Sequence, residues 1–166
     1  MIILGIDPAL TITGYGVIEV DKNRLVVLEA GIIKTSPSQG LASRLDRIYQ
    51  AMVKLIADTK PEIMVLEKLF AHYRHPTTAY LLGHARGVIC LAAARVKIPV
   101  AEYAATRVKK SIVGKGLASK QQVQKMVAAT VGLKILPKYT DVTDALALAM
   151  AHSYISEATT YGAKRT

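Results

Sequence analysis

The first ten residues, "MIILGIDPAL" (residues 1–10), form an apolar run that ends close to a carboxylate, Asp7. The length and composition of residues 2–6 predict a buried β-strand. A second run, "EIMVLE" (residues 62–67), repeats this design and ends in Glu67. A buried anion without a partner costs free energy, and sites in open α/β sheets gather at strand ends. Asp7 and Glu67 are therefore candidate site residues.

The rest of the chain predicts an α/β domain with a central mixed sheet of five strands flanked by helices. Two further strands, joined by the turn "VDKN", follow the first, so the first three strands are expected to be antiparallel neighbours. The predicted elements after the first strand are strands over 14–20, 25–34, 62–67 and 98–103, and helices over 41–55, 77–96, 107–110, 120–130 and 140–156. We expect a single domain over residues 1–158 and a short flexible tail over 159–166.

Composition excludes several classes of protein. With 166 residues and 51% hydrophobic content, the chain can bury the core of one globular domain. Its apolar runs are shorter than the roughly 18 residues that a membrane span needs, and the first residues lack a basic leader. A single cysteine, Cys90, leaves no disulfide framework and no zinc site. These features predict a cytoplasmic protein without a membrane partner.

The charge balance predicts a polyanionic partner. The chain carries 22 Lys and Arg against 12 Asp and Glu, a formal charge of +10. Between residues 95 and 138 ten basic residues share the sequence with one acid, Glu102. Such a balance in a small domain is typical of nucleic-acid binding, although a solvated basic surface is the alternative. The absence of a basic amphipathic helix with large aromatic residues disfavours a membrane surface.

Two more acids belong with Asp7 and Glu67. Asp141 and Asp144 lie three residues apart at the start of the last predicted helix and so share one face. Taken alone, they are more readily explained by the helix dipole and capping than by a site. Four converging carboxylates, however, need a cation among them, and hard oxygen ligands select Mg²⁺ or Mn²⁺. Two such ions, about 4 Å apart, could clamp the attacking and leaving oxygens of a phosphodiester, which indicates a nuclease.

Several motifs also resemble one family over nearly the whole chain. The segments "ILGIDPALTITGYGVIE", "MVLEKLF", "GHARGVI", "PVAEYAATRVKKSIVGKGLASKQQVQKMV" and "TDVTDALALAMAH" are similar, in order and spacing, to the bacterial RuvC Holliday-junction resolvases. The resemblance implies a ribonuclease-H-like fold and a homodimer that nicks two opposing strands of a four-way DNA junction. It implies two Mg²⁺ ions per subunit, with Mn²⁺ as a substitute, and a branch-migration motor of RuvA and RuvB as partner. The metal-binding and catalytic carboxylates would be Asp7, Glu67, Asp141 and Asp144.

The resemblance also suggests residues that contact DNA. Phe70 in "EKLF" matches the family's aromatic residue that stacks on an unpaired base, and Lys109 and Lys120 match its lysines near the active site. A lone Phe is often a core residue, but the polar neighbourhood of Phe70 favours an exposed stacking group. The further predicted DNA contacts are His72, Tyr73, Arg74, His75, Lys110 and Lys115.

One turn, one histidine and one helix face each allow more than one interpretation. Ala9 stands where the family has glycine in "GIDPG", so the turn after Asp7 would differ if it needs a positive φ. His152 is predicted to be packed or solvated and not to bind metal. The apolar face of the predicted helix 77–96 is either core or a dimer seam.

Two other classes of protein compete with the resolvase interpretation. "GIDPALTITGYGV" also resembles the first hairpin of sugar-kinase and actin-like ATPases, but 166 residues leave no room for their second domain. A non-catalytic DNA-binding module or an RNA-processing nuclease of the same fold is the other alternative.

Overall fold

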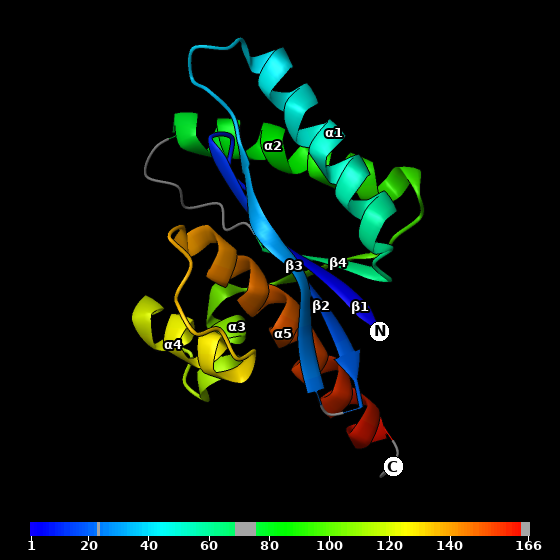
Figure 1. Ribbon diagram of the computed structural model, residues 1–166, viewed down its shortest axis with the longest axis vertical. Helices are drawn as coiled ribbons and strands as arrows, with labels where there is room; N and C mark the ends of the chain where they lie inside the picture. Colours follow the sequence, from blue (N-terminus) through cyan, green and yellow to red (C-terminus); the bar gives the residue numbers. More distant parts are fainter. Residues whose placement is uncertain (23, 69–75, 164–166) are drawn as a thin grey trace.

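The computed structural model describes residues 1–22, 24–68 and 76–163, and a single five-stranded sheet lies at its centre (Figure 1). The strands are β1 (Ile2–Asp7), β2 (Ile12–Asp21), β3 (Arg24–Lys34), β4 (Ile63–Glu67) and β5 (Val100–Tyr103). The helices are α1 (Leu41–Thr59), α2 (Pro76–Arg95), α3 (Ala105–Val113), α4 (Lys120–Thr130) and α5 (Thr140–Ala163). Every predicted element is present, and the boundaries differ by a few residues.

The sheet is mixed, in the order β3-β2-β1-β4-β5. β1, β2 and β3 are antiparallel neighbours, whereas β4 and β5 run parallel to β1. The tight β2–β3 connection permits antiparallel pairing, and the helices α1 and α2 provide the crossovers that parallel strands need. The predicted mixed five-stranded sheet with three antiparallel strands is confirmed.

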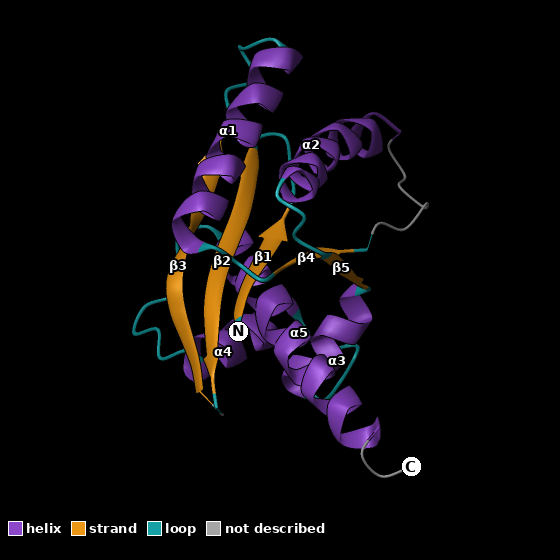
Figure 2. Ribbon diagram, turned by 90° about the vertical axis from the view of Figure 1, so that its right-hand side faces the viewer, coloured by secondary structure: helices purple, strands orange, loops and turns teal. Residues whose placement is uncertain are grey.

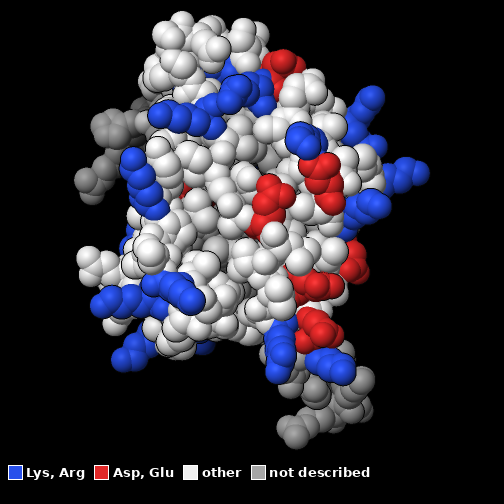
Figure 3. Space-filling model, in the orientation of Figure 1, with Lys and Arg blue, Asp and Glu red and all other residues white. Residues whose placement is uncertain are grey.

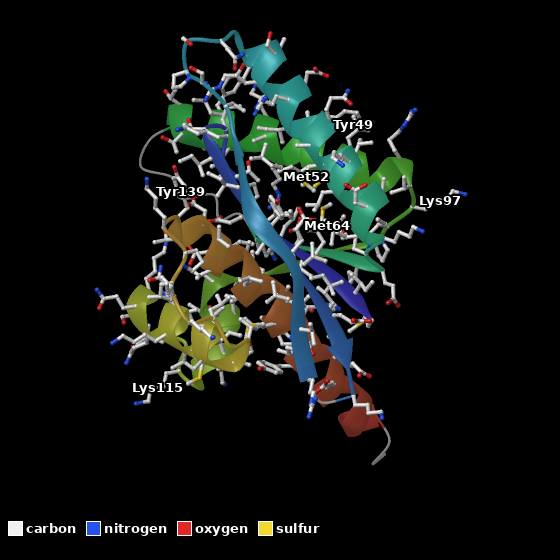
Figure 4. All side chains as sticks on the ribbon, in the orientation of Figure 1. Tyr49, Met52, Met64, Lys97, Lys115 and Tyr139 are labelled. Atoms are coloured by element: carbon white, nitrogen blue, oxygen red, sulfur yellow. The ribbon has the colours of Figure 1, made fainter. Side chains whose placement is uncertain are left out.

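Helices cover both faces of the sheet (Figure 2). α1 and α2 pack on one face, where Leu4 and Ile6 of β1 meet Ile48 and Met52 of α1 in one apolar core. Met52 and Met64 point into the layer between α1 and the sheet (Figure 4). α3, α4 and α5 lie on the other face, over a second core. The domain therefore has three layers.

Strand alternation decides which face receives the acids. Ile3 in β1 and Val65 in β4 belong to the core under α5, whereas their neighbours Leu4 and Leu66 belong to the core under α1 and α2. Successive side chains of a strand point to opposite faces, so residues two apart share a face. Asp7 and Glu67 consequently lie on the face that α5 covers.

Glycines let α5 contact the strands at backbone distance. A Cβ added at Gly5 would overlap the carbonyl oxygen of Ala145, and one added at Gly14 would overlap that of Asp141. Gly5 also pairs across the sheet with Gly16, so the surface without side chains that faces α5 extends over both β1 and β2. The close approach fixes the height of α5 above the sheet to within the size of a methyl group.

The last helix extends further than the sequence predicts. α5 continues to Ala163, so its final residues lie inside the segment 159–166 that the sequence predicts as a tail. The domain boundary at 158 stays a prediction. Among the described residues, no helix is both long and apolar enough to cross a membrane.

Candidate active site

Four carboxylates from three elements meet at one end of the sheet. Asp7 and Glu67 end the neighbouring parallel strands β1 and β4, one residue beyond the paired residues Ile6 and Leu66. Asp141 and Asp144 lie in the first turns of α5. Because Gly14 pairs with Asp7 and packs against the backbone of Asp141, the strand acids and the helix acids are brought to the same place.

Asp7 has the most perturbed carboxyl group of this cluster. Burial, and then the charges of Asp144, Asp141 and Glu67, raise its pKa from 3.8 to about 7, while Lys120 acts in the opposite direction. The contributions of all three acids show that the four groups interact. The cluster favours a bound cation, because a cation would stabilise the ionised form of Asp7.

Glu67 has a similar environment with more positive neighbours. Burial and the charge of Asp144 raise its pKa, whereas the charges of Lys109, Lys120 and Arg86 lower it. The positive charges on the surrounding helices therefore offset part of the rise in pKa that burial and the neighbouring acids cause at Asp7 and Glu67.

Two lysines complete the site. Lys120 Nζ donates to Asp144 Oδ2 at 2.6 Å, and this hydrogen bond raises the pKa of Lys120. Lys109, Lys120, Glu67 and Asp144 together line a cavity of about 240 Å³ between β4 and α3, α4 and α5. Its remaining walls are apolar, from Ala105, Val108, Val123, Ala147 and Leu148.

The start of α4 fixes the backbone of Lys120. Lys120 is the first residue of this helix, and the preceding Ser119 is its N-cap. Ser119 Oγ accepts from the backbone N–H of Gln122 at 3.2 Å, and Gln122 Oε1 accepts from the N–H of Ser119 at 2.8 Å. This reciprocal capping box satisfies two free backbone donors and aims the start of α4 at Asp144.

The four carboxylates suit a hard divalent cation, but their present arrangement is not a complete coordination site. Among residues 1–22, 24–68 and 76–163, no three His, Cys, Asp or Glu side chains are close enough to hold a metal ion as they stand. Asp144 instead pairs with Lys120. The four acids offer only oxygen ligands, which suit Mg²⁺ or Mn²⁺ better than zinc. The Lys120 ammonium occupies one of the two carboxylate oxygens of Asp144, Oδ2.

The predicted DNA-contacting residues fall into three groups. Phe70, His72, Tyr73, Arg74 and His75 lie outside the described residues. Lys109 and Lys120 line the same cavity as Glu67 and Asp144, and their contact with DNA stays a prediction. Lys110 and Lys115 are exposed and do not line the cavity, and Lys115 lies at the edge of the molecule (Figure 4).

Charge is unevenly distributed over the surface. In Figure 3, Lys and Arg side chains lie along the left-hand edge, over α4 and the segment that leads to α5, and a second group lies on the right-hand edge. The Asp and Glu side chains visible on this face lie mostly to the right of its centre. The basic edge therefore adjoins the elements that carry the active-site lysines.

The turn after Asp7 does not depend on glycine. Outside glycine, the described residues with positive φ are Lys22, Lys60 and Lys97, so Ala9 has an ordinary backbone conformation. Thr13 Oγ1 closes this turn by donating to the carbonyl oxygen of Ala9 at 2.6 Å. Alanine is accommodated here without strain.

His152 is bound to another side chain. Its Nδ1 lies 2.8 Å from the Tyr103 hydroxyl, and burial lowers its pKa. This agrees with the expectation of a packed histidine.

The mixed sheet, the acids at the ends of adjacent parallel strands and the acidic start of α5 define a nuclease of the ribonuclease-H-like class. The sequence matches the model of the family "Crossover junction endodeoxyribonuclease RuvC" over residues 3–152. The chain belongs to this family.

Relatives from bacteria support the assignment over almost the whole chain. A crossover junction endodeoxyribonuclease RuvC from Rhodopirellula baltica is 46% identical over 93% of this chain and 86% of its own. The one from Heliobacterium modesticaldum is 48% identical over 92% of this chain and 95% of its own. The structure of Thermus thermophilus RuvC in complex with a Holliday junction substrate matches with a TM-score of 0.91, at 34% identity over 96% and 97% of the two chains.

Sequence reasoning missed the glycines that shape the site. Gly5, Gly14 and Gly16 contact α5, and the sequence pattern alone assigns them no role in the site. The register of β1 and β2 reveals the pattern: Gly5 and Gly16 are cross-strand partners, and Gly14 is the partner of Asp7. Glycines that pair across two strands indicate close approach of another backbone.

Proposed function

We propose that this protein resolves four-way DNA junctions by hydrolysing one phosphodiester bond in each of two opposing strands. The observation that carries the proposal is the acid cluster: Asp7, Glu67, Asp141 and Asp144 converge beside Lys109 and Lys120. Lysines next to a phosphate neutralise it, and the acids hold the cation that neutral or basic residues could not. Membership of the crossover junction endodeoxyribonuclease family supports the same activity.

The carboxylates would hold Mg²⁺, with two ions per subunit, and Mn²⁺ would substitute. When bound, the metal supplies an activated water and stabilises charge on the reacting phosphate. The raised pKa of Asp7, about 7, supports this role, because a buried acid among other acids gains most from a cation. Lys120 is placed to move from Asp144 to a phosphate oxygen of the substrate.

DNA would lie along the basic edge of the molecule. We assign phosphate contacts to Lys109, Lys110, Lys115 and Lys120, of which the first and last also line the cavity beside Glu67 and Asp144. Phe70 would stack on an unpaired base, with His72, Tyr73, Arg74 and His75 beside it. Binding that depends on several phosphate contacts should weaken steeply with salt.

A two-fold junction with two symmetric cuts calls for a two-fold protein, so we propose a homodimer. Tyr80 and Leu91, both at least half exposed on α2, are candidates for its interface. The family resemblance also suggests RuvA and RuvB as partners and the cytoplasm as the place of action.

The test is cleavage of a labelled four-way junction beside a linear duplex and an RNA–DNA hybrid, with and without Mg²⁺. We expect paired symmetric nicks in the junction alone. Asp7→Asn should lose cleavage by about 10³-fold, because metal activation is worth several kcal/mol, and should still bind the junction. Asp46→Asn, which changes an exposed acid on α1, is the matched control and should cut normally.

Other outcomes favour the alternatives. Binding without metal-dependent cutting would indicate a DNA-binding module with structural acids, and cutting of the hybrid would indicate an RNA-processing nuclease. Normal cutting by Asp7→Asn would remove the acid cluster from the mechanism.

A further inference from the structure

Arg86 is a buried cation on the face of the sheet opposite to the carboxylates. It lies on α2 with only 8% of the residue exposed, among Ala85, Ile89 and other apolar residues. A buried guanidinium is costly unless its donors are paired. Its partners therefore indicate why a core position carries a charge.

The guanidinium joins the ends of two strands. Nη1 donates to the backbone carbonyl oxygen of Glu67 at 2.8 Å, and Nη2 donates to Glu102 Oε1 at 2.6 Å. Glu67 ends β4, and Glu102 lies in the neighbouring β5. One side chain of α2 thus holds the two strands where the active site begins.

The hydrogen bond from Arg86 to the Glu67 carbonyl oxygen affects where the Glu67 side chain points. Glu67 is the last residue of β4, and the backbone N–H of Lys68 still donates to the carbonyl oxygen of Tyr103 at 2.8 Å. Arg86 holds the carbonyl of the same peptide unit. Because a peptide unit is planar, holding both of its polar groups fixes its orientation, and with it the Cα of Glu67.

We propose that Arg86 is a positioning residue for Glu67, which it reaches from behind the sheet through the backbone carbonyl. Arg86 touches neither substrate nor metal. It keeps the Glu67 carboxylate on the α5 face, at the height of Asp7 and Asp144, and Glu102 holds the guanidinium in place. The cleavage part of the test rests on the proposed function, whereas the metal-binding part does not.

A purely structural ion pair makes a different prediction. If Arg86 only stabilised the fold, its loss would lower the melting temperature and leave the metal affinity of the folded protein unchanged. If it positions Glu67, metal affinity and turnover fall in protein that is still folded, because a ligand displaced by about 1 Å can cost 10²-fold in rate.

Three variants and a control separate the two roles. Arg86→Gln removes the charge and the planar pair of guanidinium donors. Arg86→Lys keeps the charge but cannot place two donors in a fixed geometry. Glu102→Gln loosens the guanidinium and leaves its bond to Glu67. Arg95→Gln, an exposed arginine of the same helix, is the matched control.

Mn²⁺ binding is measured by the loss of the free-ion electron paramagnetic resonance signal, beside thermal unfolding and junction cleavage. We expect Mn²⁺ affinity to fall about 10-fold or more in Arg86→Gln and less in Glu102→Gln and Arg86→Lys. Turnover should fall by about 10²-fold in Arg86→Gln, with the junction Kd within about three-fold of wild type. Arg95→Gln should match wild type.

Unchanged Mn²⁺ affinity in folded Arg86→Gln overturns the proposal, whether or not the wild type cuts junctions. If Arg86→Gln does not fold, Glu102→Gln and Arg86→Lys decide: wild-type Mn²⁺ affinity in both overturns it. A wild type that binds Mn²⁺ but fails to cut contradicts the proposed function alone.

Discussion

The two faces of the sheet are packed by different means. Under α1 and α2, helix and sheet are separated by large side chains such as Ile6, Met52 and Leu66. Under α5, the helix backbone comes down to Gly5 and Gly14, where a methyl group would not fit. The first face is an apolar core that contains the Arg86–Glu102 ion pair, and the second carries the four carboxylates of the candidate site.

This difference has a chemical reason. Aspartate has a short side chain, so Asp141 and Asp144 can join Asp7 only if the helix backbone itself lies close to β1 and β2. A layer of large side chains would hold the acids too far apart to share a cation. If this is correct, substitutions at the close contacts or at the clustered carboxylates should affect the α5 face, and matched substitutions on the face under α1 and α2 should not affect cleavage.

The largest effect concerns the charge of Asp7. Its folded pKa, about 7, lies above the ordinary 3.8, so between these values the folded protein holds a proton that the unfolded chain has lost. Stability of the metal-free protein should therefore fall as pH rises from 4 to 7. Asp7→Asn should remove this pH-dependent contribution. At pH 8 its free energy of unfolding should exceed that of wild type by on the order of 4 kcal/mol, so that it unfolds at a higher urea concentration.

Urea unfolding in EDTA at pH 4, 6 and 8 measures this difference. Asp46→Asn, on the exposed side of α1, should stay within about 0.5 kcal/mol of wild type at each pH. Equal stability of Asp7→Asn and wild type at pH 8 would show that burial and the neighbouring acids do not make the ionised form of Asp7 unfavourable.

Gly14→Ala tests the close approach directly. The new methyl group would overlap the backbone of Asp141, so α5 must move away, at a cost of about 3 kcal/mol. Cleavage should fall with it, because the helix acids move from Asp7. Denaturant unfolding and junction cleavage are the measurements.

Gly87→Ala in α2 is the matched control on the other face. Nothing lies within 4 Å of its added Cβ, so the change should stabilise the helix by about 0.5–1 kcal/mol and leave cleavage intact. If Gly14→Ala were equally well tolerated, the close approach of α5 would not be what assembles the site.

Ser119→Ala should have a smaller effect. Loss of the capping box removes about 1 kcal/mol of stability and loosens the start of α4, where Lys120 meets Asp144. Cleavage should fall several-fold, with little change in the unfolding cooperativity. On the other face, the N-cap of α1 is Gly40, which makes no side-chain cap bond.

Gly40→Ser is thus the complementary experiment, because it adds a capping hydroxyl. It should raise stability by a few tenths of a kcal/mol without changing cleavage. A similar loss of cleavage in both variants would mean that the cap of α4 has no special role in the site.

The smallest loss of stability is expected at Ala9. Its φ is not positive, so Ala9→Gly gains nothing in the turn and only adds freedom to the unfolded chain, at a cost of about 0.5 kcal/mol. Thermal unfolding should show this loss, and cleavage should stay within about two-fold. A marked gain in cleavage would show that alanine strains this turn.

Most of the secondary structure could be predicted from local patterns. The apolar runs before Asp7 and Glu67, the helical spacing from Leu41 to Leu55 and the turn between β2 and β3 all specify their elements through nearby residues. The end of α5 was missed because "TTYGAKRT" lacks apolar periodicity, while the helix continues to Ala163. Local patterns place helix ends poorly since end residues pack little.

The site was only partly predictable. The four acids stand out because each is an exception to an apolar or helical pattern, and Lys109 and Lys120 were suggested by family resemblance. Arg86 drew no attention, since an arginine within a helical pattern usually faces solvent. Its burial depends on Glu67 and Glu102, which are 19 and 16 residues away in the chain.

The sequence by itself determined the elements, the strand parity that puts Asp7 and Glu67 on one face, and the basic character of the chain, because these follow from local periodicity and composition. The tertiary structure alone decided the distance between α5 and the sheet, the pairing of Lys120 with Asp144 and the burial of Arg86. Those features depend on which backbones and side chains touch across the fold, and contact between segments far apart in the chain leaves no mark in the local pattern.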